Sequence, residues 1–172
     1  DSKLLFMAGI LLRNIEWNGS QVDILIEGNS ISEVAPAGKI VVKEVDADTV
    51  DCTGKAAMPG FVNMHTHAGM AMMRGVGEDI GFHEWLARIW EIEKKIDEEY
   101  VYHATKVACL EMIKTGTTTF NDQYWYMPMA YKAASEMGLR SALSYVICDR
   151  NDPEESERQK VQCQEMFEMT KA

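Results

Sequence analysis

The first 57 residues alternate short apolar runs with turn residues. Apolar runs at positions 4–12, 22–27 and 31–34 have the length of strands, and the pairs Asn18-Gly19 and Gly28-Asn29 separate them. Asn and Gly accept the positive φ angles that tight hairpin turns require. The pattern therefore predicts a small β meander over residues 1–57, forming a domain of its own.

From residue 58 onward the pattern changes to strands that alternate with helices. It predicts strands at 61–64, 117–120 and 139–148, and helices at 82–96, 97–114, 127–137 and from 151 to the end. Such alternation is typical of a parallel sheet with right-handed crossovers, so the expected fold class is α/β. An eight-stranded (β/α) barrel needs ~200 residues or more. Residues 58–172 have room for about three βα units, and we expect the chain to be the N-terminal part of a longer protein.

The candidate chemistry lies where the first of these strands ends. The apolar run 61–64 is predicted to be a buried strand, and His65 and His67 follow it two residues apart. Residues i and i+2 of a strand point to the same face, where two imidazoles can bind one divalent metal ion. Pairs of this kind are also common among surface histidines, so the spacing alone leaves both interpretations open. Residues 68–81 hold four glycines, which predict a mobile loop that either covers the site or simply connects two elements.

Three segments resemble a known family. Residues 51–67, which end in Met-Pro-Gly-Phe-Val-Asn-Met-His-Thr-His, resemble the first barrel strand of the amidohydrolase superfamily. Residues 73–79 (Met-Arg-Gly-Val-Gly-Glu-Asp) and 82–86 (Phe-His-Glu-Trp-Leu) resemble the branch of methylthioadenosine and S-adenosylhomocysteine deaminases. That branch is similar to the chlorohydrolases and the cytosine or guanine deaminases.

The resemblance implies a fold and a reaction. Residues 1–57 would be the N-terminal portion of a β-sandwich, and residues 58–172 the first three units of a TIM-like (β/α)8 barrel. His65 and His67 would bind a divalent metal, expected to be zinc, which activates a water for hydrolytic deamination of an adenosine-type nucleoside. Further ligands and the catalytic glutamate would come from later strands, so no catalytic residue is expected within the 172 residues. The chain alone is therefore expected to turn over little or nothing.

Two acidic residues are secondary candidates. By the resemblance, Glu84 would bind the ribose diol, because a carboxylate can accept hydrogen bonds from two neighbouring hydroxyls. A glutamate in the first turn of a helix also complements the helix dipole, which is the simpler explanation. Asp122, at the end of the second predicted strand, is open to interpretation as a supporting residue of the site or as an ordinary loop aspartate. His83 and His103 have no partner in the motif and are expected to be structural or exposed.

The composition of the chain limits the kinds of binding partner that are expected. The formal net charge of −10 argues against nucleic acid or an anionic membrane and leaves a small-molecule substrate as the expected partner. No apolar run reaches 18 residues, and the first residues lack the form of a signal peptide. Four widely spaced cysteines form no Cys-x-x-Cys pair, which is typical of a reduced, cytoplasmic protein.

Two alternatives to a nucleoside deaminase stay open. The first is another enzyme of the same superfamily, either a chlorohydrolase or a free-base deaminase. The second belongs to a different class: a non-catalytic binding or assembly module. In that case open sheet edges would pair with a second copy of the chain or with the missing C-terminal part of the same protein.

Overall fold

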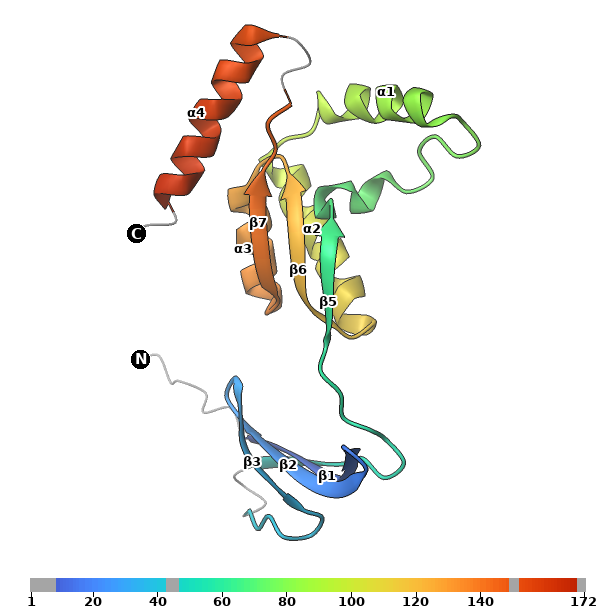
Figure 1. The fold of residues 1–172 in the computed structure, drawn as a ribbon, viewed down its shortest axis with the longest axis vertical. Helices are drawn as coiled ribbons and strands as arrows, with labels where there is room; N and C mark the ends of the chain where they lie inside the picture. The colour runs from blue at the N-terminus through green and yellow to red at the C-terminus, as the bar shows by residue number, and fades with distance from the viewer. Residues whose placement is uncertain (1–8, 43–46, 149–151, 170–172) are drawn as a thin grey trace. The chain divides into compact units, whose positions relative to one another are not determined.

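The computed structural model describes residues 9–42, 47–148 and 152–169. The chain divides into two compact units, Asp1–Pro59 and Gly60–Ala172, which we call the β unit and the α/β unit (Figure 1). Each unit has its own buried apolar clusters and is described by itself. None of the helices within the described ranges combines the length and the apolar character that crossing a membrane requires.

The β unit is a four-stranded sheet. Its strands lie in the order β3-β2-β1-β4, with β1–β2 and β2–β3 antiparallel and β4 parallel to β1. Asn18 and Gly19 form the first hairpin turn with φ angles of 51° and 78°, as the sequence predicts. The bounds are Gly9–Trp17 (β1), Ser20–Glu27 (β2), Ser30–Pro36 (β3) and Ala47–Asp51 (β4).

Two features of the β unit differ from the sequence prediction. The first described strand runs from Gly9 to Trp17 rather than over 4–12, and residues 1–8 lie outside the described part. The strand β4 was not predicted, because Ala-Asp-Thr-Val-Asp has no apolar alternation. Its pairing comes from main-chain hydrogen bonds to β1, which side-chain patterns do not reveal.

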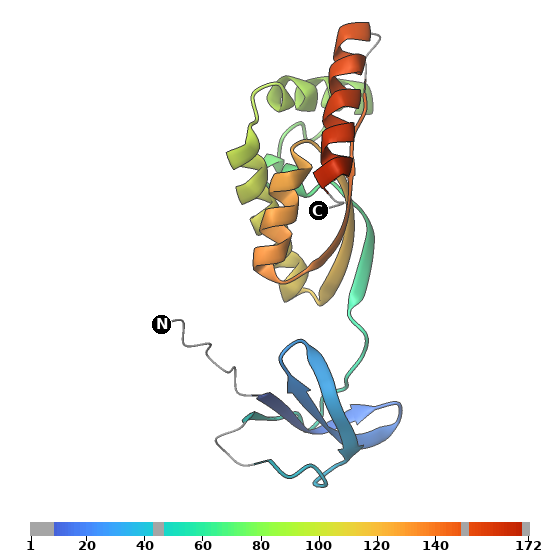
Figure 2. The same cartoon turned by 90° about the vertical axis from the view of Figure 1, so that its left-hand side faces the viewer.

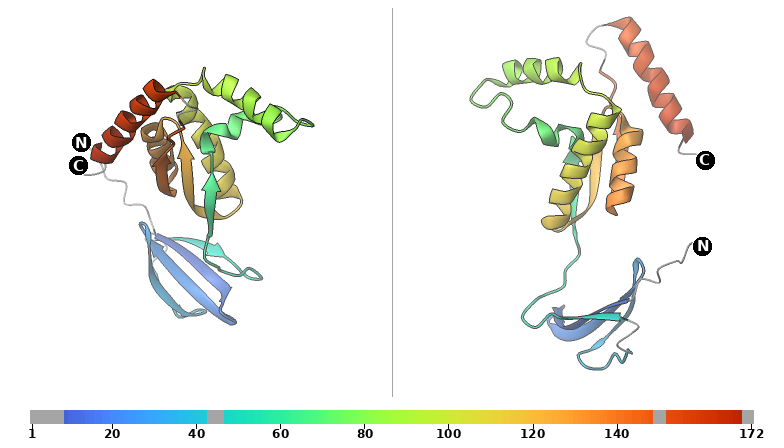
Figure 3. Two further views of the ribbon diagram at one scale, coloured as in Figure 1. Left: turned by 45° about the horizontal axis from the view of Figure 1, so that its top comes forward. Right: turned by 180° about the vertical axis from the view of Figure 1, so that it is seen from behind.

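The α/β unit contains a three-stranded parallel sheet in the order β5-β6-β7. Helices α2 and α3 cover one face of this sheet, and the other face carries no described element (Figures 1 and 2). The view from behind in Figure 3 shows the covered face. The elements are β5 (Phe61–Thr66), the 3₁₀ helix η1 (Ala68–Met73), α1 (Phe82–Glu93), α2 (Glu98–Lys114), β6 (Thr117–Tyr124), α3 (Met127–Met137), β7 (Arg140–Tyr145) and α4 (Pro153–Met169).

Local signals set the helix ends of this unit. The Asp97 carboxylate accepts a hydrogen bond of 2.8 Å from the N–H of Tyr100 and so caps α2, as predicted. Gly116 and Gly138 follow α2 and α3 with φ angles of 86° and 77°, in the left-handed region that glycine adopts without strain. The result is the mixed α/β fold with a parallel sheet that the sequence predicts; a closed barrel is not formed by the described strands.

The prediction that β5 is a buried strand is half right. The strand forms, but Phe61, Val62 and Met64 are 57%, 56% and 69% exposed. β5 lies at the edge of the sheet, and within the described residues only β6 pairs with it. Burial depends on what packs against a strand, and an apolar run alone does not supply that partner.

The segment after β5 is more ordered than its glycine content predicts. Residues 68–73 form η1, with Ala68 and Met73 buried. Gly69 lies directly against the ring of Tyr124, where a Cβ atom would come within 2.3 Å of the ring carbons. Here glycine permits close packing rather than mobility. The prediction of an irregular loop over 68–81 was therefore wrong for its first six residues.

Candidate metal centre

The two histidines of the motif lie next to each other at the carboxyl end of β5. His65 is in the strand, and His67 is the first residue beyond it and the N-cap of η1. Their ring centroids are 5.0 Å apart, and the ring planes meet at 80°. Two adjacent imidazoles on one short segment can approach a single metal ion, as the i, i+2 spacing predicts.

A hydrogen bond to β6 orients His67. Its Nδ1 atom is 2.7 Å from the main-chain oxygen of Gln123. A carbonyl oxygen can only accept, so Nδ1 carries the proton and donates, and the lone pair lies on Nε2. Metal-binding histidines use this arrangement, because a second hydrogen bond fixes the tautomer and the orientation of the ring.

Three further hydrogen bonds hold the segment around the histidines against β6. The Asn121 amide donates to the oxygen of Met64 over 3.1 Å, and the Thr66 hydroxyl donates to the oxygen of Asn121 over 2.9 Å. The Asp122 Oδ1 atom accepts from the N–H of Ala68 over 3.1 Å. The backbone on both sides of His65 and His67 is thus fixed by one neighbouring strand.

Asp122 is not a loop residue, which settles one question that the sequence left open. It lies within β6, which runs two residues further, and it is 1% exposed. Burial raises the pKa of Asp122, and the N–H of Ala68 is among the groups that oppose this rise. Its Oδ2 atom is buried without a hydrogen-bond partner among the described residues.

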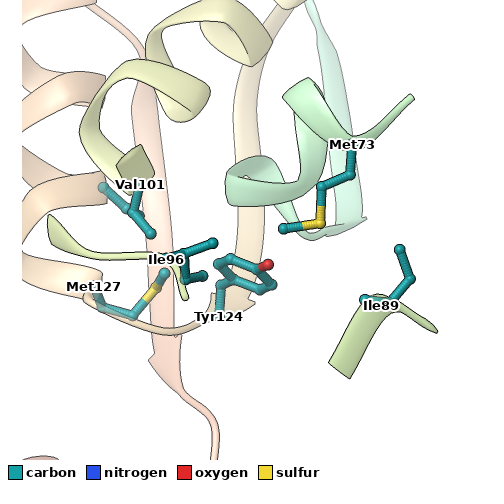
Figure 4. Close-up of a cluster of buried hydrophobic side chains, with 7 residues drawn as sticks. Met73, Ile89, Ile96, Val101, Tyr124 and Met127 are labelled. Carbon is teal, nitrogen blue, oxygen red and sulfur yellow. The ribbon is translucent and has the colours of Figure 1, made fainter. Parts of the chain in front are cut away.

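The core behind the site links η1 to the neighbouring helices. Tyr124 has Met73 of η1 and Ile89 of α1 on one side and Val101 and Met127 on the other (Figure 4). The Tyr124 ring is 6.3 Å from that of His67, centroid to centroid. At the far end of η1, Arg74 forms a two-pronged ion pair with Glu111 of α2. Both ends of η1 are therefore tied to the α/β unit.

Among the described residues, no hydrogen bond or ring contact joins the other candidate side chains to this pair. Glu84 lies in the first turn of α1 and is exposed. His83 packs edge-on against the ring of Phe82, and His103 lies 3.9 Å from Glu99 on α2; both histidines are exposed, as expected. A hollow of about 440 Å³ adjoins His67, lined also by Asn63, Thr66, Met70, Arg74 and Glu111.

His65 and His67 can supply two ligands to a metal ion, which is only part of a complete site. Nε2 of His67 is available and the ring of His65 is adjacent. Within residues 9–42, 47–148 and 152–169, no three or more His, Cys, Asp or Glu side chains gather as a metal-binding cluster. Zinc enzymes use three or more protein ligands, so the described residues fit the metal but supply only part of its shell.

Sequence reasoning named Asp122 as a candidate supporting residue and missed the other groups around the histidines. Gln123 acts through its main-chain oxygen, which leaves no trace in the residue type. Asn121 and Asp122 were visible as polar residues near a strand end, which is the one available signal. Arg74 and Glu111 are 37 positions apart, and no pattern predicts that they pair.

A parallel α/β sheet with paired imidazoles at the carboxyl end of a strand places the chain in a general class, the α/β proteins with candidate metal ligands at a strand end. Comparison with known proteins makes this specific. The family model described as "Amidohydrolase family" matches residues 56–169, and the chain belongs to this family. The resemblance seen in the sequence is thereby confirmed.

Several relatives are deaminases. The 5′-deoxyadenosine deaminase of Methanocaldococcus jannaschii is 43% identical over 152 residues, which cover 87% of this chain and 36% of that protein. The 5-methylthioadenosine/S-adenosylhomocysteine deaminase of Thermococcus sibiricus is 44% identical over 135 residues, covering 78% and 31%. The chain thus spans about a third of the length of these relatives.

Solved structures share the fold. An adenosine deaminase from Xanthomonas campestris with bound zinc matches with a TM-score of 0.65 and 26% identity, over 85% of this chain and 35% of that one. The atrazine chlorohydrolase of Arthrobacter aurescens, complexed with zinc, matches with a TM-score of 0.65 at 24% identity, over 78% and 35%. The second likeness shows the fold alone.

Proposed function

We propose that this chain supplies the first metal ligands of a zinc-dependent amidohydrolase that deaminates an adenosine-type nucleoside. The observation that carries the proposal is the pair of adjacent imidazoles, with Nδ1 of His67 donating to Gln123 and Nε2 left as a ligand. The names of the relatives support the substrate class, and the zinc bound to the adenosine deaminase neighbour supports the metal.

Four residues of the chain have a defined role in this proposal. When bound, zinc supplies a water that is acidic enough to act as a nucleophile near neutral pH. His65 and His67 hold the metal, and the Gln123 carbonyl keeps the His67 ring in the productive tautomer and raises its basicity. Glu84 accepts hydrogen bonds from the two ribose hydroxyls, which places the purine relative to the metal.

The proposal extends to the whole protein. Residues 1–57 form the N-terminal portion of a β-sandwich, and residues 58–172 form the first three units of a (β/α)8 barrel. The remaining ligands and the proton-transfer carboxylate belong to later strands. Since two imidazoles fall short of the usual three protein ligands, the 172-residue chain alone turns over little or nothing. The unpaired cysteines agree with a cytoplasmic location.

A chimera tests the substrate class. Residues 56–169 replace the matching segment of the Methanocaldococcus jannaschii relative, and the product is assayed on 5′-deoxyadenosine, methylthioadenosine, guanine, cytosine and a chlorotriazine. We expect the nucleosides to give the highest kcat/KM. A folded, zinc-loaded chimera that prefers the triazine or a free base would favour the chlorohydrolase or free-base alternative instead.

Point variants of the chimera test the residue roles. H65A and H67A should each abolish turnover, whereas H103A, which changes an exposed histidine on α2, should leave it intact. Glu84→Gln should raise KM for the nucleosides and leave KM for adenine unchanged, because adenine has no ribose. Equal effects of Glu84→Gln on both substrates would contradict a ribose contact.

One observation favours the assembly alternative as a second candidate. Phe61, Val62 and Met64 expose an apolar edge strand, and within the described residues nothing pairs with the outer edge of β5. Exposed edges of this kind pair with other strands. Size-exclusion chromatography and metal analysis decide: a stable oligomer that excludes zinc supports an assembly module, and a zinc-binding monomer contradicts it.

A further inference from the structure

The carboxylate of Asp122 joins the two residues that orient His67. Its Oδ1 atom accepts from the N–H of Ala68 over 3.1 Å and from the N–H of Gln123 over 2.9 Å. Ala68 directly follows His67, and Gln123 provides the oxygen that accepts from the imidazole over 2.7 Å. One oxygen atom thereby closes a small ring of hydrogen bonds around the histidine.

We propose that Asp122 is a positioning residue of the metal centre. The Oδ1 atom of Asp122 holds the backbone after His67 in the place where the His67 imidazole can donate its hydrogen bond to Gln123. This inference rests on the proposed metal-binding function of His67. Asp122 touches neither the metal nor the substrate in this proposal. It acts through the tautomer and the orientation of the imidazole.

Burial protects the bond between Asp122 and Ala68, which is one side of this hydrogen-bond ring. Asp122 and Ala68 are 1% and 4% exposed, and Ala68 packs with Phe120 and Cys109 in one apolar cluster. Water therefore does not compete for the N–H of Ala68, and a buried N–H without an acceptor is costly. The strand alternates its side chains, so Asp122 points to the helix-covered face while the carbonyl of Gln123 is left for His67.

Burying a carboxylate at position 122 lowers the stability of the fold relative to an apolar side chain. A buried carboxylate loses its hydration, and its Oδ2 atom has no hydrogen-bond partner among the described residues. A leucine of similar size would fill the same space without that loss. What leucine would not supply is an acceptor for Ala68 and Gln123, and this is the property that the proposal assigns to the residue.

The test compares Asp122→Asn, Asp122→Ala and Asp122→Leu in the 172-residue chain. Asparagine keeps an Oδ1 acceptor and removes the charge, and leucine removes the acceptor while filling the volume if the alanine variant does not fold. Val101→Ala is the control for lost stability, because Val101 is fully buried in a different cluster. Two quantities are read: the His67 tautomer, from long-range ¹H–¹⁵N NMR spectra at a pH where imidazole is neutral, and the zinc affinity, from competition titration.

Asp122→Ala and Asp122→Leu should lose the Nδ1–H tautomer of His67 and weaken zinc binding about 10- to 100-fold, the usual effect of removing a supporting hydrogen bond. Asp122→Asn should keep both, and Val101→Ala should lower stability while keeping the tautomer. An alanine or leucine variant with the wild-type tautomer and affinity overturns the proposal. Equal losses in Asp122→Asn and Asp122→Ala overturn it too, since charge would then be the property that matters.

The proposed metal binding by His65 and His67 and the proposed positioning role of Asp122 can be refuted independently. If the wild-type chain binds no zinc, the proposed function of His65 and His67 fails. The tautomer comparison needs no metal, so it still decides whether Asp122 positions His67.

Discussion

The contact between η1 and Tyr124 makes the strongest structural prediction, because a single methyl group tests it. In Gly69→Ala the new Cβ would lie 2.3 Å from two carbons of the Tyr124 ring. Ordinary carbon contacts begin near ~3.5 Å, so the overlap is about 1.2 Å. The ring has little room to retreat, since it is 4% exposed and has Met73 on one side and Val101 and Met127 on the other (Figure 4).

The consequences extend from stability to the metal centre. Overpacking of a tight core costs about 1–3 kcal/mol, and we expect Gly69→Ala to lower the free energy of unfolding by that amount. The shift also reaches His67, whose carbonyl oxygen accepts from the N–H of Met70 in the same 3₁₀ helix over 2.8 Å. We therefore expect zinc affinity to fall about tenfold, as for a lost supporting contact.

Chemical denaturation and zinc titration measure both effects. Gly81→Ala is the matched control, because a Cβ there meets no atom within 4 Å and the φ angle is −67°. It should cost less than about 1 kcal/mol, the loss of a modest N-cap, and leave zinc binding unchanged. In a Tyr124→Leu background, Gly69→Ala should cost less than in the wild type, because the ring is gone. Wild-type stability of Gly69→Ala, or strict additivity with Tyr124→Leu, would refute the reasoning.

Three further predictions concern other parts of the chain. Asp23 is fully buried and 2.5 Å from Arg13, so Asp23→Ala should destabilise the β unit by about 2–3 kcal/mol in urea unfolding, and an unchanged midpoint would contradict this. Although burial acts to raise it, hydrogen bonds from backbone N–H groups and Arg13 hold the pKa of Asp23 below its ordinary value. The stability it provides is therefore fully present above about pH 4 and is lost as the pH falls through the lowered pKa, which acid titration of wild type against the variant checks. Burial and, to a lesser extent, the nearby carboxylate of Asp122 raise the pKa of the Cys109 thiol to about 11. At pH 8, Cys109 should therefore react with a thiol reagent only when the protein unfolds. Rapid labelling of the native protein would contradict the burial of Cys109. Asp97→Ala removes the acceptor of the Tyr100 N–H and should cost about 1 kcal/mol in thermal unfolding, with Asp97→Ser as the rescuing cap; a neutral alanine would show that the cap contributes nothing.

The elements that the sequence predicted best are those with strong local signals. The helix capped by Asp97, the turns at Asn18-Gly19 and the strand that carries His65 all formed where expected. In each case the determinant is a residue type acting on its immediate neighbours: a carboxylate that caps, a glycine that accepts positive φ, or an apolar run before a polar pair.

What the sequence did not reveal depends on distant backbone. β4 forms by main-chain pairing with β1, and the orientation of His67 depends on the main-chain oxygen of a residue 56 positions away. Any residue type can provide such an oxygen. The burial of Asp122 was likewise hidden, because it depends on β6 running past the predicted strand end and on α2 covering that face.

The central claim is that His65 and His67 together bind a metal through a preset tautomer. Titrating zinc into the ¹⁵N-histidine-labelled 172-residue chain tests it directly. The ring nitrogens of both residues should shift together, with Nδ1 of His67 remaining protonated, while His83 and His103 stay unchanged. Independent shifts at the two rings, zinc on Nδ1 of His67, or no response from either ring would contradict the account.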